Sequence, residues 1–120
     1  MNDEVLDLAQ LKECRDLVNA VDWDLTPQQA FETYQLKSRD NWRASATGEV
    51  LYFYVSAWQG ENKVFLVRRT LKHSEEIAEI AVPDDLVAAC VVEQEGSYIP
   101  RGQCPINDQV RDWLQAHLKS

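Results

Sequence analysis

The stretch from Leu51 to Val67 restricts the fold of this chain more than any other part of the sequence. Its first half is rich in aromatic and β-branched side chains, and a second apolar run ends at Val67. A four-residue connection that contains Gly60 separates the two runs. This pattern predicts an antiparallel hairpin with strands at about 50–58 and 63–70.

The first strand of this hairpin carries large apolar groups on both of its faces, because side chains alternate along a strand. Such a strand is either covered on both sides or presents an aromatic surface to a partner. We expect cover, since helices are predicted toward both ends of the chain. Leu51, Phe53, Val55 and Ala57 point one way, and Tyr52, Tyr54 and Trp58 point the other.

Two helices are predicted before the hairpin. Apolar residues recur at steps of three and four across residues 3–21, which is typical of an amphipathic helix. Thr26, Pro27 and Gln29 then supply a hydroxyl N-cap, a proline at the first helical position and a glutamine at the third. We expect this second helix to run to about Lys37.

Two more helices are predicted after the hairpin. Pro83 and the acids that follow it favour a helix start, because acids in the first turn oppose the helix dipole. This helix should stop at Gly96. Residues 97–105, which include two prolines and a glycine, are predicted to form a loop. Asn107 and Asp108 then start the last helix.

The order of these elements indicates an α+β fold. We predict an antiparallel three- to four-stranded meander with two N-terminal and two C-terminal helices packed on it. An edge strand at 41–45 and a strand at 77–82 would complete the sheet. Because the sequence contains no linker, repeat or low-complexity segment, residues 1–120 are predicted to form a single domain.

The composition is typical of a globular protein, with 45% hydrophobic and 27% charged residues. The cysteines indicate a reducing compartment. Cys14, Cys90 and Cys104 are odd in number, and none of them forms a Cys-x-x-Cys pair. The N-terminus is acidic, unlike a secretory signal. No apolar run approaches the roughly 20 residues that cross a bilayer. We therefore expect a cytoplasmic protein without a membrane segment.

The net charge of −8 is unevenly distributed. Residues 35–73 hold seven bases and three acids, whereas the segments on either side are acidic. The overall sign argues against binding to duplex DNA, which depends on clustered Lys and Arg. The basic centre either neutralises the acidic ends within the fold or forms a site for a partner. Its candidate partner-binding residues are Arg39, Arg43, Arg68, Arg69 and Lys72.

Cys104 is the alternative reactive group. It lies near Arg101 in a loop just before a predicted helix, where a cation and the helix dipole would lower the pKa of the thiol. This arrangement suggests a small-ligand or thiol-dependent enzyme, although no neighbouring Cys or His supplies a base. An inert thiol is the simpler interpretation, and Cys90 is expected in the core.

Tyr52, Tyr54 and Trp58 suggest a third hypothesis, in which exposed rings stack on single-stranded RNA and Arg68 and Arg69 contact its phosphates. The sequence lacks a ribonucleoprotein consensus, and packing of the rings under a helix is the plainer explanation. The acidic surroundings would also repel a nucleic-acid backbone.

No metal or cofactor is indicated by the sequence. His73 and His117 have no partners at the spacing that zinc ligands usually show. The four glycines are isolated, so none forms a phosphate-binding loop.

About a quarter of the chain, within residues 50–82, resembles small uncharacterised bacterial proteins, including some from sulfate-reducing bacteria. The resemblance rests on the run Val64-Phe65-Leu66-Val67-Arg68-Arg69 and on Glu76-Ile77-Ala78-Glu79-Ile80. It implies a bacterial, cytoplasmic origin and transfers no functional residues. Our leading hypothesis is a non-enzymatic interaction or regulatory domain that binds a protein partner or itself. Its contact surface would be the basic centre or an uncovered strand edge.

Overall fold

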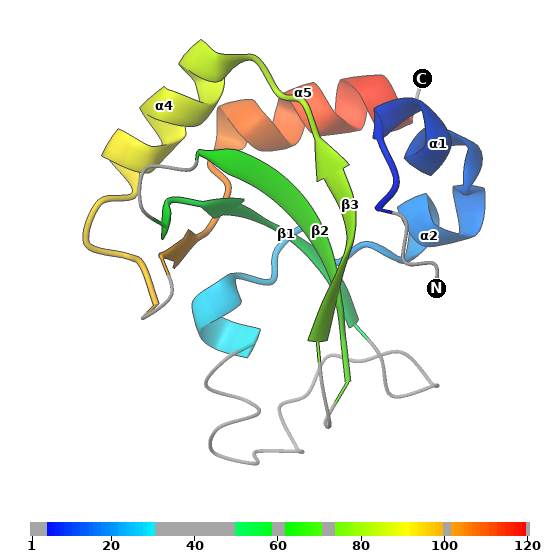
Figure 1. Cartoon of the computed structure of the whole chain (residues 1–120), viewed down its shortest axis with the longest axis horizontal. Coiled ribbons are helices and arrows are strands. Elements are labelled where there is room, and N and C mark those ends of the chain that lie inside the picture. Colours follow the sequence, from blue (N-terminus) through cyan, green and yellow to red (C-terminus); the bar gives the residue numbers. More distant parts are fainter. Residues whose placement is uncertain (1–4, 31–49, 59–61, 71–73, 100–101, 120) are drawn as a thin grey trace.

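The computed structural model describes residues 5–30, 50–58, 62–70, 74–99 and 102–119 (Figure 1). The antiparallel strands and the helices near both ends of the chain confirm the α+β class. Its helices are α1 (Leu8–Glu13), α2 (Arg15–Ala20), α4 (Asp84–Glu93) and α5 (Asp108–Leu118), and a further helix begins at Pro27. Its strands are β1 (Val50–Ser56), β2 (Lys63–Arg69), β3 (Ser74–Ile80) and β4 (Gln103–Cys104).

The four strands form one antiparallel sheet in the order β3-β2-β1-β4. The predicted hairpin is confirmed, because β1 and β2 pair along their whole lengths from Val50 opposite Arg69 to Ser56 opposite Lys63. In this register Phe53 faces Leu66 and Val55 faces Val64 across the ladder. These apolar cross-strand pairs fix the register of the central strands.

Strand β3 begins earlier than the predicted strand at 77–82, because Ser74 already pairs with Arg69. Its register shifts once, so that Ile77 is an extra residue between the pairs made by Glu76 and Ala78. Leu6 bonds to the outer edge of β3. Its amide donates to the Ile77 carbonyl at 3.0 Å, and its carbonyl accepts from the Glu79 amide at 3.0 Å.

The outer edge of β1 is occupied by two short segments. Val21 forms a parallel bridge with Leu51 near one end of the strand. At the other end, β4 pairs with Val55 and Ser56. The predicted loop at 97–105 therefore contains a short strand, which is held by its pairing with β1.

Both faces of β1 are buried in the structure. The first core lies under α1, α2, α4 and α5, and a second core lies on the opposite face, where the helix that begins at Pro27 packs (Figure 1). Helices from both ends of the chain thus share one face of the sheet. The first core includes Leu51, Phe53, Val55, Leu66, Val87, Cys90, Cys104, Val110 and Leu114. The second core consists of Leu25, Ala30, Val50, Tyr52, Tyr54, Phe65 and Val67.

The N-terminal segment departs from the single helix predicted over 3–21. Cys14 has φ −89° and ψ 74°, which is outside the helical region and separates α1 from α2. Leu6 is held in the bridge to β3, so α1 begins only at Leu8. Asp7 caps α1 by accepting from the Gln10 amide at 2.8 Å.

The predicted start of the second helix is confirmed by its hydrogen bonds. The Thr26 hydroxyl accepts from the Gln29 amide at 3.1 Å, and the Gln29 side chain accepts from the Thr26 amide at 3.0 Å. These reciprocal bonds form a capping box. The predicted course of this helix to Lys37 and the predicted strand at 41–45 lie outside the described residues.

The two C-terminal helices begin close to their predicted positions. Pro83 precedes α4, with Asp84 and Asp85 in the first turn, and α4 ends at Glu93 before Gly96. Asn107 is the N-cap of α5. Among the described residues, the structure contains no helix with the length and apolar character needed to span a membrane.

Candidate functional site

The end of α4, β4 and the start of α5 meet at a buried pair of thiols. Cys90 and Cys104 are both fully buried. The Cys90 thiol donates a hydrogen bond to the Pro105 carbonyl at 3.5 Å, and Cys90 and Cys104 each affect the pKa of the other. Groups from two elements that are separated in sequence therefore meet at this point.

The two thiols differ in their electrostatic surroundings. Hydrogen bonding from Cys104 lowers the pKa of Cys90 against the effect of burial, and a backbone contact to Asn107 adds to this lowering. The hydrogen bond to Cys90 and burial both raise the pKa of Cys104.

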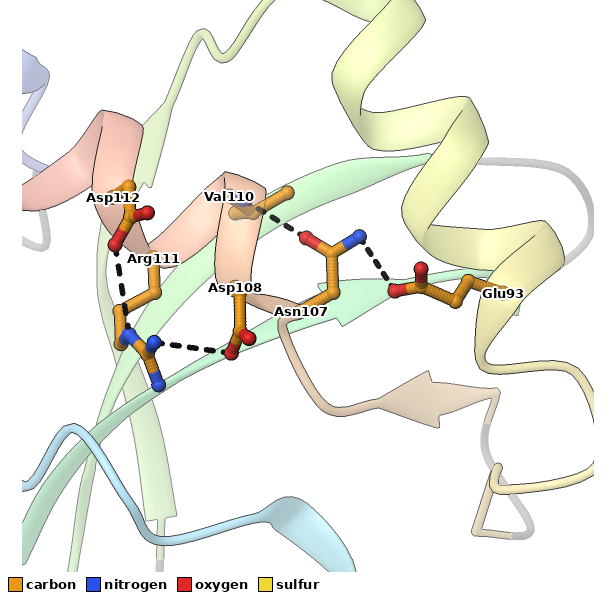
Figure 2. Close-up of polar contacts among 6 residues, drawn as sticks. All are labelled: Glu93, Asn107, Asp108, Val110, Arg111 and Asp112. Carbon is orange, nitrogen blue, oxygen red and sulfur yellow. Dashed lines mark hydrogen bonds and ion pairs between the residues drawn. The ribbon is translucent and has the colours of Figure 1, made fainter.

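Asn107 connects the end of α4 to the start of α5 (Figure 2). Its side-chain oxygen accepts from the Val110 amide at 2.9 Å, and its Nδ2 donates to Glu93 Oε1 at 2.8 Å. The side chain is almost fully buried, so both of its polar ends need partners. One residue thus caps α5 and holds the last turn of α4.

A cleft of about 420 Å³ lies over this junction. Asp108 at its margin pairs with Arg111 at 3.0 Å, and Arg111 also lies 3.9 Å from Asp112 (Figure 2). The cleft therefore has an acidic lining in which part of the charge is already compensated. It is lined by Glu93, Gln94, Ile106, Asn107, Asp108 and Gln109.

A smaller cavity of about 260 Å³ involves the opposite face of the sheet. Burial raises the pKa of Tyr52 there, and the nearby Arg69 guanidinium opposes that shift. The Tyr54 hydroxyl donates to Glu76. The cavity brings tyrosine, arginine, glutamine and carboxylate groups together, but each of the residues named here already contacts a neighbour. It is lined by Tyr52, Val67, Arg69, Ser74, Glu75, Glu76 and Gln103.

The sequence-predicted arginines are only partly within the described structure. Arg68 Nη1 lies 3.7 Å from Glu75 Oε1 across the β2–β3 ladder. Arg69 lies against Tyr52. Both described arginines therefore have acidic or phenolic neighbours. Arg39, Arg43 and Lys72 lie outside the described residues.

The structure corrects the expected chemistry of Cys104. A lowered pKa is expected for an accessible thiol beside Arg101, but Cys104 is fully buried and its pKa is raised. The reason is that Cys104 lies in β4, where it pairs with Val55 and contacts Cys90. Arg101 lies outside the described residues.

The three aromatic residues proposed for RNA stacking do not share one environment. Tyr52 and Tyr54 are 1% and 2% exposed, respectively, in the second core. Trp58 is 51% exposed. In this structure, Tyr52 and Tyr54 are therefore not available as a stacking platform.

The outward face of α4 is an apolar surface that the sequence analysis did not identify. Ala88 and Ala89 are exposed, and Val92 is 71% exposed. Apolar residues also occupy the inward face of this helix, where Val87 and Cys90 are buried. Because both faces are apolar, periodicity alone does not distinguish the inward face from the outward one.

Within the described ranges, no group of three or more His, Cys, Asp and Glu side chains is placed to hold a metal ion. Comparison of the chain with protein-family models, with curated proteins and with solved structures finds no match. The function is therefore inferred from the residues of this chain alone.

Proposed function

We propose that this chain is a small acidic interaction domain that binds a basic, partly apolar protein segment through the outward face of α4. The observation that carries the proposal is the exposed stripe on that helix. Asp85, Ala88, Ala89 and Val92 are all exposed and are spaced at i, i+3, i+4 and i+7. This spacing places them along one side of the helix.

The three apolar residues of this stripe, Ala88, Ala89 and Val92, support a binding role. Val92 is the most exposed of the large hydrophobic residues in the described part of the chain, at 71%. It stands on a helix whose other face is packed into the first core through Val87 and Cys90. Apolar surface rimmed by polar groups is typical of contact sites between proteins.

The charge around the stripe specifies the chemistry of the partner. Residues 74–99 contain seven acids and no Lys or Arg. Asp84, Asp85 and Glu93 are exposed on α4 itself, and Glu93 also lines the acidic cleft. A partner with Lys or Arg around an apolar centre complements this surface.

A second copy of the chain fits this surface less well. In a two-fold contact the same patch meets itself, which would bring the acidic rims of two α4 helices together. Strand edges are also less accessible than expected, since Leu6 bonds to β3 and both Val21 and β4 bond to β1. These contacts favour a different protein as the partner and α4 as the contact element.

The test uses a defined probe, a helical peptide with leucine on one face and lysine on the other. Amide chemical shifts measured by NMR during a titration should change along α4. Val92→Ser should weaken binding by roughly 10- to 30-fold, because burial of a valine contributes about 1.5–2 kcal/mol. Added salt should weaken it further.

Val5→Ser is the matched control, because Val5 is also exposed, at 46%, but lies outside α4. It should leave the affinity within about twofold of the original value. Equal effects of Val92→Ser and Val5→Ser would contradict the proposal. Shift changes centred on Arg68 and Arg69 would place the surface on the β2–β3 ladder instead.

A further inference from the structure

Cys90 and Cys104 are placed as a pair although 13 residues separate them in the chain. Both thiols are fully buried in the first core, where each one affects the pKa of the other. The bond from Cys90 to the Pro105 carbonyl at 3.5 Å holds its thiol next to the residue that follows Cys104. Two elements, α4 and β4, thus present sulfur atoms to each other.

We infer that Cys90 and Cys104 form an oxidisable dithiol, a site at which a small disulfide such as oxidised glutathione introduces an intrachain disulfide bond. This site is independent of the α4 surface proposed above. The reduced pair is the state described by the structure, in which both cysteines are free thiols.

The reaction proceeds in two thiol–disulfide exchanges. The Cys90 thiolate attacks one sulfur of oxidised glutathione, which forms a mixed disulfide and releases one glutathione thiolate. The Cys104 thiolate then attacks the Cys90 sulfur, which releases the second glutathione thiolate. The protein loses two electrons and two protons, and oxidised glutathione is reduced to two glutathione molecules.

The reagent would reach the buried pair through local opening of β4. Strand β4 contains only two residues and is joined to β1 by two residue pairs, Val55 with Cys104 and Ser56 with Gln103. Short edge segments open more easily than central strands. Cys14 lies at the junction of α1 and α2, outside α4 and β4.

The test is peptide mapping of the folded chain after exposure to oxidised glutathione. Trypsin cleaves after Lys72, Arg101 and Arg111, so Cys90 and Cys104 fall in two different peptides, 73–101 and 102–111. The expected product is these two peptides joined by a disulfide, with a mass loss of two hydrogens. The whole chain should melt higher, by on the order of 10 °C, because the bond closes a loop of about 15 residues.

A Cys14→Ser chain is used as the background, which removes intermolecular pairing through Cys14. The joined peptides should form in this background under native conditions and disappear after reduction. Glutathione attached to Cys90 or Cys104 without the joined peptides would overturn the inference. Joined peptides that form only in denaturant would overturn it as well, because the folded structure would then not bring the thiols together.

Discussion

The burial of Tyr52 on β1 makes the stability of the fold depend on pH. Its ring lies in the second core, and its hydroxyl contacts Arg69. Burial raises the pKa of Tyr52 above its usual value of 10.0, although Arg69 opposes this shift. The neutral phenol is therefore the form that the folded state prefers.

This preference predicts a loss of stability at alkaline pH. When folding raises the pKa of a group, that group stabilises the folded state fully at any pH below its unfolded pKa. This contribution is lost as the pH rises through the pKa of the folded state. The free energy of unfolding should therefore fall above about pH 10. Tyr52→Phe has no ionisable hydroxyl, so its free energy of unfolding should fall less steeply in the same range.

Urea unfolding of both chains between about pH 7 and pH 11 measures this difference. Tyr52→Phe should be less stable near neutrality by about 1 kcal/mol, because the contact to Arg69 is lost. Identical alkaline slopes for the two chains would show that Tyr52 ionises as it does in the unfolded state.

At the scale of single elements, Gly102 determines whether β4 can reach β1. Gly102 has φ +72°, a conformation that favours glycine. A Cβ added there would lie 2.9 Å from both the backbone nitrogen and the Cα of Trp58. The Gly102 carbonyl accepts from the Ala57 amide at 2.7 Å, so the close approach is part of the pairing.

Gly102→Ala should therefore destabilise the fold and detach β4. Gly96→Ala is the matched control, because Gly96 has φ +92° but no atom within 4 Å of an added Cβ. The control measures only the free-energy cost of placing an alanine at positive φ, about 1 kcal/mol. We expect Gly102→Ala to cost roughly 1–3 kcal/mol more in urea unfolding, because the backbone of Trp58 must move. Equal costs for the two variants would indicate that the contact with Trp58 is not restrictive.

The elements that the sequence predicts well are those with local signals. The capping box of Thr26 and Gln29 and the N-cap Asn107 lie within a few residues of the helices that they start. The hairpin of β1 and β2 is marked by two strand-like runs and a short connection between them. In each case the hydrogen-bonding partners are close in sequence, so composition and spacing are sufficient.

The elements that the sequence does not predict depend on distant partners. Strand β4 is held by β1, and the break at Cys14 accompanies the bridge of Leu6 to Ala78. The pairing of Cys90 with Cys104 follows from β4 and was missed for the same reason. The only hint in the sequence is that both cysteines stand next to apolar or proline residues, which is too general to indicate a contact.

The candidate surface on α4 could not be predicted from the sequence for a different reason. The helix itself follows from Pro83 and the acids of its first turn. The sequence does not predict which face of this helix points outward, because Val87, Ala88 and Val92 are equivalent in a helix that is apolar on both sides. Only the packing against α5 and the sheet shows that Val87 is buried and Val92 exposed.

At the scale of the whole molecule, one sheet separates two apolar clusters. Phe53 belongs to the first core, where it stacks with Trp23 at a ring distance of 5.3 Å. Tyr54 belongs to the second core and packs against Phe65 at 5.6 Å. Adjacent residues of β1 thus pack into opposite cores. Among the described residues, Val92 on the outward face of α4 is therefore far more exposed than the apolar residues of β1.

The burial of β1 from both sides is tested most directly by hydroxyl-radical footprinting of the folded chain, with oxidation at each residue measured by mass spectrometry. We predict that Tyr52, Phe53 and Tyr54 are all protected, whereas Trp58, which is 51% exposed, is oxidised rapidly. Oxidation of Tyr52 and Tyr54 at a rate close to that of Trp58 would contradict the two-sided core and reopen the sheet as a binding surface.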